Sequence, residues 1–82
     1  MATMWTVVGF NSTDEFFRTK VSILPGEAQQ LVRTLAARHL SDQEIADAFA
    51  GRNSLLEVRS DGGAKTPTVT CGENPHYVAS ED

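Results

Sequence analysis

Apolar and polar residues alternate between residues 17 and 23. The apolar or β-branched positions are Phe17, Thr19, Val21 and Ile23, and the polar positions between them are Arg18, Lys20 and Ser22. This period of two is typical of a strand with one buried face. Residues 4–10 (MWTVVGF) are rich in β-branched and aromatic side chains and predict a second strand. The polar residues 11–14 favour a turn between the two. Ser12 and Glu15 also match the start of a capped helix, but the alternation through Ile23 favours a β-hairpin.

The spacing of apolar residues becomes helical after Pro25. Proline suits the first turn of a helix, where its missing amide is not needed. Apolar positions then recur at intervals of three and four, at Ala28, Leu31, Val32, Leu35, Ala36 and His39. This stripe predicts one amphipathic helix that ends near Leu40. We expect Leu35 to be among the most buried residues, because it lies in the middle of the stripe.

A second helix is indicated by Ser41 and Glu44, which form a capping box. The Ser41 hydroxyl accepts from the amide of the third helical residue, and the Glu44 carboxylate accepts from the Ser41 amide. The apolar positions of this helix are Ile45, Ala48 and Phe49. Gly51 is placed to end it, since a glycine after the last turn adopts the left-handed conformation easily. The two helices should meet at a sharp corner, with Phe49 deeply buried.

Two further strands are predicted at residues 55–59 and 66–71. The sequence Asp61-Gly62-Gly63 between them is a strong signal for a hairpin turn. Pro67 cannot donate a hydrogen bond to a neighbouring strand, so we expect the last strand at an edge of the sheet. These elements predict an α+β fold in a small single domain. The expected order is ββααββ, an antiparallel sheet with two helices packed on one face.

The 82 residues are enough for one domain, for which we expect the limits 1–72. Residues 73–82 contain three acidic side chains, no Lys or Arg, and only Tyr77 and Val78 as sizeable apolar groups. Ordering a residue costs about 1–2 kcal/mol of backbone entropy. We therefore predict that residues 73–82 are an acidic, mobile C-terminal tail. A fifth strand through residues 76–78 is the alternative.

The net charge of −4 is concentrated near the C-terminus. With three acidic residues in 73–82, residues 1–72 sum to only −1. A nearly neutral body weakens the case for nonspecific phosphate binding, which usually needs an excess of Lys and Arg. No apolar run approaches the roughly 18 residues of a membrane span, and the N-terminus lacks the pattern of a signal peptide. We expect a cytoplasmic protein that does not bind membranes.

Candidate catalytic and metal-binding residues are few. Cys71, His39 and His76 are the only Cys and His residues, and neither CxxC nor HxxxH occurs. Cys71 is followed by a glycine and Glu73, which supply neither a base nor a positive charge to activate the thiol. Residues 61–65 lack the GxxxxGK[ST] pattern of a phosphate-binding loop. We expect no enzymatic activity, no metal and no cofactor.

Residues 35–49 contain the run Leu-Ser-x-x-Glu-Ile-Ala and resemble the first helix and turn-proximal part of a LuxR-type helix-turn-helix. The resemblance implies DNA binding through a recognition helix that would begin near residues 51–53. The sequence departs from the family there, because residues 55–58 are Leu-Leu-Glu-Val and lead into the glycine turn. Only one Arg occurs where several basic side chains are wanted.

A docking surface is indicated by the alternation in the predicted strands. If Phe17 faces the helices, Arg18 and Lys20 face outward, and Arg59 and Trp5 can share that face. For Trp5, this requires Met4, Val8 and Phe10 to point inward. Trp and Arg dominate interface hot spots.

The leading hypothesis is a small non-enzymatic protein-binding module, such as an inhibitor, immunity-type or accessory factor. It would use this face or an edge strand. The alternative is a nucleic-acid-binding protein that uses the corner at residues 35–58 or the basic sheet face. An exposed edge strand also allows a homodimer.

Overall fold

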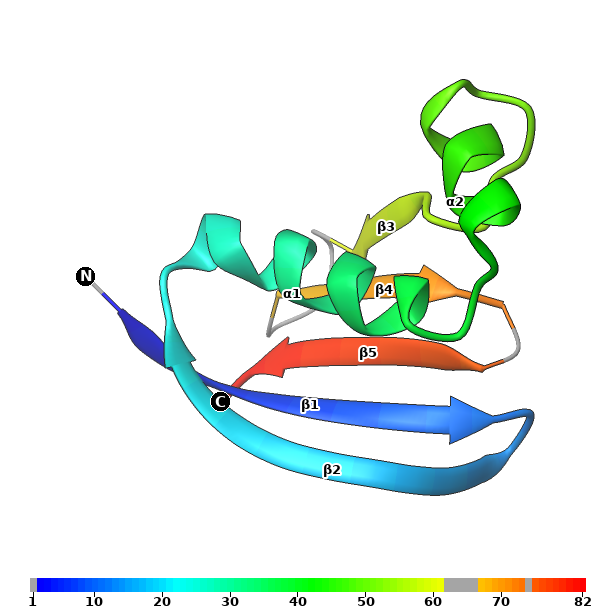
Figure 1. Ribbon diagram of the computed structural model, residues 1–82. Coiled ribbons are helices and arrows are strands. Elements are labelled where there is room, and N and C mark those ends of the chain that lie inside the picture. Colours follow the sequence, from blue (N-terminus) through cyan, green and yellow to red (C-terminus); the bar gives the residue numbers. More distant parts are fainter. Residues whose placement is uncertain (1, 62–66, 74) are drawn as a thin grey trace.

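The residues that the computed structural model describes, 2–61, 67–73 and 75–82, form one antiparallel sheet of five strands with two helices (Figure 1). The elements are β1 (Thr3–Asn11), β2 (Asp14–Ile23), α1 (Pro25–Ala37), α2 (Asp42–Phe49), β3 (Val58–Asp61), β4 (Thr68–Gly72) and β5 (His76–Glu81). The strands lie in the order β2-β1-β5-β4-β3. The predicted α+β class with an antiparallel sheet is confirmed, but the element order is ββααβββ rather than ββααββ.

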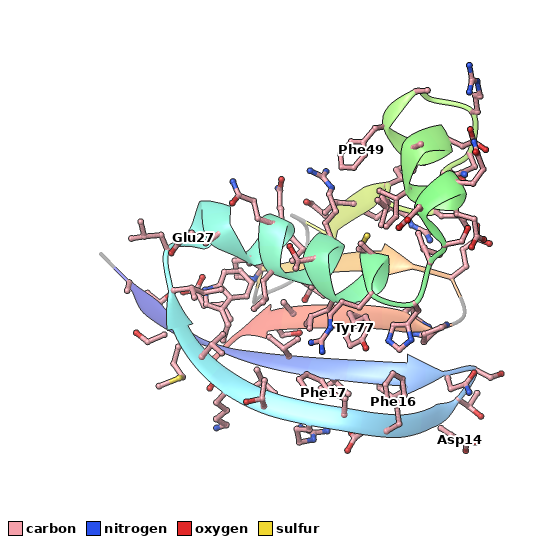
Figure 2. All side chains as sticks on the ribbon, in the orientation of Figure 1. Asp14, Phe16, Phe17, Glu27, Phe49 and Tyr77 are labelled. Atoms are coloured by element: carbon pink, nitrogen blue, oxygen red, sulfur yellow. The ribbon has the colours of Figure 1, made fainter. Side chains whose placement is uncertain are left out.

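The N-terminal hairpin is confirmed, with β1 paired to β2 through the turn at residues 12–13. The register shifts between Gly9 and Phe10, so that Gly9 faces Phe17 while Phe10 faces Glu15. This bulge leaves Phe16 as an extra residue on β2. Phe16 and Phe17 therefore both reach the ring of Tyr77, with centroid distances of 5.8 and 5.9 Å (Figure 2).

The prediction of a mobile tail at residues 73–82 is wrong. Strand β5 is the central strand of the sheet and pairs with β1 on one side and β4 on the other. Tyr77 is 4% exposed and Ala79 is fully buried. The two apolar anchors, Tyr77 and Val78, do not by themselves offset the entropy cost of ordering this segment. The backbone hydrogen bonds of β5 to both neighbours contribute as well, since they satisfy groups that are costly to bury unpaired. A domain that ended at residue 72, as expected from the sequence, would leave out this strand.

Strand β4 is internal, so the expectation that Pro67 places it at an edge is also wrong. Pro67 lies one residue before β4 begins at Thr68, and its missing amide is therefore not required by the ladder. Its carbonyl accepts from the Glu81 amide at 3.1 Å. The predicted strand at residues 55–59 starts later, at Val58. Gly62 and Gly63 of the predicted turn lie outside the described residues.

Helix α1 begins at Pro25 as predicted, and the Glu27 carboxylate accepts from the Leu24 amide at 2.8 Å. Its buried stripe consists of Ala28, Val32 and Ala36. This stripe packs mainly on β4 and β5, on the upper face of the sheet in Figure 1. Small residues in the stripe allow the helix to approach the strands closely.

Helix α2 has the predicted capping box. The Ser41 hydroxyl accepts from the Glu44 amide at 3.2 Å, and Glu44 Oε1 accepts from the Ser41 amide at 2.9 Å. Gly51 follows with φ of 79°. The expectation that Phe49 is buried is wrong, because its side chain is 74% exposed. Helix α2 lies beyond the end of α1 and projects away from the sheet (Figure 1). No residue of α2 is buried, and Leu35 of α1 is only partly buried.

The expected exposure of Trp5 is wrong. Trp5 is 2% exposed and lies with fully buried Val7 on the face covered by α1, whereas Met4 is 46% exposed on the opposite face. Both alternating sets of side chains in β1 are apolar, so the alternation does not choose between them. Gly9 favours the observed choice, because a Cβ there would lie 2.8 Å from the Tyr77 ring. The absence of a side chain at position 9 leaves room for the Tyr77 ring.

Substitutions of Trp5 and Phe49 should change the free energy of unfolding by different amounts, because Trp5 is buried and Phe49 is exposed. Trp5→Ala should cost about 3–5 kcal/mol of unfolding free energy, the range for truncating a buried aromatic residue. Phe49→Ala should change it by less than about 0.5 kcal/mol, as expected for an exposed position. Urea titrations monitored by circular dichroism measure both, with Trp5→Phe as a milder variant if Trp5→Ala does not fold. Equal losses would contradict the placement of these residues.

Deletion of residues 73–82 should abolish the cooperative thermal transition. It removes the strand that joins β1 to β4 and leaves both with unpaired backbone groups. Deletion of Asp82 alone is the control and should preserve the transition, because it removes one backbone hydrogen bond to the Met4 carbonyl and only exposed side-chain contacts with Thr6 and Lys20. Differential scanning calorimetry tests this. A truncated protein that melts within a few degrees of the full chain would show that β5 is dispensable.

Candidate docking surface

The sheet face opposite α1, which we call the outer face, is covered by no helix or strand of the described chain (Figure 1). Its side chains are those that alternate with the core residues. They are Met4, Thr6, Val8 and Phe10 on β1, Glu15, Arg18, Lys20 and Ser22 on β2, His76, Val78 and Ser80 on β5, Thr68 and Thr70 on β4, and Arg59 on β3. An antiparallel sheet with one uncovered face normally shows polar residues there, so the apolar members of this set need an explanation.

One row of side chains crosses the whole outer face. The strand register places Arg18 opposite Val8, Val8 opposite Val78, Val78 opposite Thr70 and Thr70 opposite Arg59. Neighbouring strands lie about 4.8 Å apart, so the two arginine Cα atoms are separated by roughly 19 Å. The row is therefore apolar at its centre and positively charged at both ends.

The apolar part of the outer face follows the two central strands. Val8 and Val78 are half-buried partners at its centre. Beside them, the Phe10 and His76 rings are stacked with centroids 5.3 Å apart and planes inclined by 19°. Met4 lies further along β1, beyond Thr6, which faces Ser80 of β5. The neighbouring positions on β2 and β4 are polar, so the apolar band is two strands wide.

The basic side chains of β2 form exposed ion pairs. Arg18 contacts Glu15 through two hydrogen bonds of 2.6 and 3.3 Å, and this interaction lowers the pKa of Glu15. Lys20 Nζ lies 3.4 Å from Asp82 Oδ2. The pKa of Asp82 is lowered first by the hydrogen bond that the Thr6 hydroxyl donates at 2.7 Å and then by Lys20. Exposed ion pairs of this kind contribute little to stability. Both cations can therefore exchange their carboxylate partners for others.

Three of the four predicted site residues, Arg18, Lys20 and Arg59, lie exposed on the outer face. No ion pair of Arg59 is found within the described part of the chain. Trp5, the fourth, is excluded by its burial in the core. The sequence does not indicate Val8 or Val78, because β1 is apolar on both faces and residues 73–82 carry no local signal of a strand.

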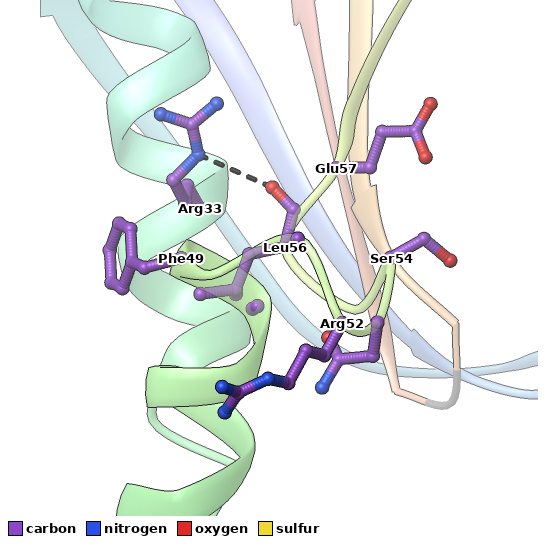
Figure 3. Close-up of a pocket in the computed structure, with 9 residues that line it drawn as sticks. Arg33, Phe49, Arg52, Ser54, Leu56 and Glu57 are labelled. Atoms are coloured by element: carbon purple, nitrogen blue, oxygen red, sulfur yellow. Dashed lines mark hydrogen bonds between the residues drawn. The ribbon is translucent and has the colours of Figure 1, made fainter.

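A groove of about 490 Å³ lies between α1, α2 and the loop at residues 50–57 (Figure 3). Its polar side chains hold the loop in place. Arg33 Nε donates to the Leu56 carbonyl at 3.3 Å, and Arg52 donates to Asp47 at 3.2 Å. In Figure 3 the two guanidinium groups do not converge on a common point. The groove therefore lacks the converging polar groups that a catalytic site needs.

The cysteine and histidine side chains are buried, hydrogen-bonded or stacked on a neighbouring ring. Cys71 is fully buried on β4, and burial raises the pKa of its thiol. His39 follows α1, with its Nε2 atom 2.6 Å from the Tyr77 hydroxyl. His76 is stacked on Phe10. In the parts of the chain that the structure describes, no group of three or more metal-ligating side chains is found.

The helix-turn-helix alternative lacks its recognition helix. After α2, residues 50–57 form turns and loop rather than a helix, and the chain then enters β3. The side chain of Asn53 fixes this loop. Its Nδ2 atom donates to the backbone carbonyl of Glu44 at 3.2 Å, and its Oδ1 atom accepts from the backbone amide of Leu55 at 3.1 Å. No helix therefore follows α2 within residues 50–57, where the resemblance places the recognition helix.

Neither helix of the described residues has the length and apolar character needed to cross a membrane. No protein-family model, curated protein or solved structure matches the chain.

The Cys71 thiol should be unreactive in the folded protein. Its raised pKa keeps it neutral near pH 7.5, whereas the thiolate is the reacting form. Reaction with a chromogenic disulfide reagent should be slower than in the urea-unfolded chain by on the order of tenfold or more, because β4 must open first. Thr70→Cys, which introduces a thiol on the outer face in a Cys71→Ala background, is the fast-reacting control. Equal rates for the two folded thiols would contradict the burial of Cys71.

Proposed function

We propose that this chain is a small non-enzymatic protein-binding module, such as an inhibitor, immunity-type or accessory factor, which docks its partner on the outer face. The observation that carries the proposal is the row from Arg18 to Arg59, with Val8 and Val78 at its centre. Protein interfaces combine an apolar centre with a polar rim and are enriched in Arg. The absence of converging catalytic groups among the described residues supports the non-enzymatic part.

The outer face fits this role better than the sheet edges. Strand β2 is a long edge strand, but it carries Arg18 and Lys20, and charged side chains oppose pairing with another strand. Two copies could pair antiparallel through β2, with the two-fold axis at residue 18, 19 or 20. Arg18 would then lie opposite the second copy's Arg18 or Lys20, or the two copies of Lys20 would face each other. Like charges directly opposite are destabilising. At the other edge, β3 has only four residues. We therefore do not propose a homodimer through these edges, and a cytoplasmic location stays a prediction.

A second candidate is binding of single-stranded nucleic acid on the same face. It is favoured by the stacked Phe10 and His76 rings together with Arg18 and Arg59, because bases stack on aromatic side chains while cations contact the phosphates. Fluorescence anisotropy with labelled oligonucleotides at about 50 mM salt, where phosphate contacts are strong, tests this candidate. Affinity that falls steeply with added salt would support it, and no binding at low salt would exclude it.

Binding of the natural partner should depend on the centre of the outer face. The double variant Val8→Thr/Val78→Thr keeps β-branched side chains on both strands but replaces a methyl group with a hydroxyl in each. It should weaken binding by about tenfold, because a hydroxyl buried at the centre of an interface without a hydrogen-bond partner costs about 1–3 kcal/mol. Affinity capture from the native lysate, followed by titration of the recovered protein, measures this. Phe49→Ser is the matched control, since it removes an exposed aromatic residue far from the outer face.

Melting temperatures verify that both variants remain folded. A partner that binds the wild type and the double variant equally, or that is lost only with Phe49→Ser, would overturn the assignment to the outer face. Recovery of no stoichiometric partner would count against a protein-binding function.

A further inference from the structure

The shape of the apolar band on the outer face restricts what can cover it. The apolar part of the outer face is confined to β1 and β5, where Val8 and Val78 lie beside the stacked Phe10 and His76 rings, since β2 presents Arg18 and Lys20 beside it and β4 presents threonines. Two strands span about 10 Å. This width matches one α-helix, which measures about 10–12 Å across with its side chains. A second sheet would cover the polar positions of β2 and β4 as well.

The charges beside the band restrict the partner further. On one side, Arg18 and Lys20 lie on the strand next to the band, and on the other side Arg59 lies two strands away. Their present carboxylate partners, Glu15 and Asp82, are in exposed ion pairs that are easily exchanged. A helix lying along β1 and β5 would therefore meet positive charge on both of its flanks.

From this geometry we infer that the partner contributes an amphipathic α-helix with an apolar stripe and acidic residues on both sides of it, docked along β1 and β5 between Arg18 and Arg59. The inference rests on the proposed function and specifies the chemistry of the partner. The opposite face already packs one helix, α1, against this sheet. The docked helix would complete a second helical layer.

The apolar centre of the outer face favours a helix over nucleic acid as the occupant. The cations do not separate the two, because a phosphate chain and an acidic helix would both compete with Glu15 and Asp82 for them. A helix with an apolar stripe covers Val8 and Val78, which a phosphate backbone leaves uncovered.

The test uses a fluorescently labelled, alanine-rich peptide of about 18 residues, since shorter isolated helices are marginal in water. One peptide carries a Leu and Ile stripe flanked on both sides by Glu. A second has the same stripe flanked by Lys, and a third has the composition of the first in scrambled order. The Glu-flanked peptide should bind at least about tenfold more tightly than the other two, because like charges across an interface are strongly unfavourable.

Charge reversal supplies the specific control. The double variant Arg18→Glu/Arg59→Glu should prefer the Lys-flanked peptide, and Val8→Thr/Val78→Thr should weaken binding of the Glu-flanked peptide. Amide chemical shifts should change on β1 and β5 and remain unchanged near Phe49. Equal binding of all three peptides, or shift changes confined to the groove beside α2, would overturn the inference.

The outcomes distinguish this inference from the function on which it rests. The captured partner could require Val8 and Val78 although this protein binds none of the peptides. That result would refute the acidic helix and would still support the outer face as the docking surface. A single-stranded oligonucleotide that displaces the partner from this face in a salt-dependent manner would also refute the acidic helix. If the captured partner bound the wild type and the Val8→Thr/Val78→Thr variant equally well, the proposed function would be refuted instead.

Discussion

The fold depends on the insertion of β5 between β1 and β4. Without this strand, the N-terminal hairpin and the β3–β4 ladder would be two separate pieces, because β5 supplies the hydrogen bonds that join them. Tyr77 at its start anchors the strand. Its ring packs against Phe16 and Phe17, and its hydroxyl lies within hydrogen-bond distance of His39. The close approach of this ring to β1 requires the glycine at position 9.

The same strand creates the candidate docking surface. Alternation along β5 sends Tyr77 and Ala79 into the core and places Val78 on the outer face, opposite Val8. Neither valine alone makes an apolar centre. The two arginines come from the opposite edges of the sheet and share a row only because β1, β5 and β4 lie between them in register. The core and the outer face are thus two consequences of one pairing arrangement.

The candidate site was predicted in part, and the reason differs from residue to residue. Arg18 and Lys20 were placed outward because β2 has one clearly polar set of alternating positions. Trp5 was misplaced because β1 is apolar on both sides, so its orientation depends on what its neighbours present rather than on its own pattern. Phe49 was misplaced because α2 projects past the sheet, which leaves the end of its apolar stripe without a surface to cover.

The sequence by itself determined the features that rest on interactions between near neighbours. These are the turn between β1 and β2, Pro25 at the start of α1, the hydrogen bonds between Ser41 and Glu44 and the glycine after α2. Only the tertiary structure decided that residues 76–81 form the central strand and that Trp5 faces the helix. The physical reason is that a strand is stabilised by backbone groups and side chains far away in the chain. A short acidic segment with two apolar residues carries no local signal of the neighbours that it will join.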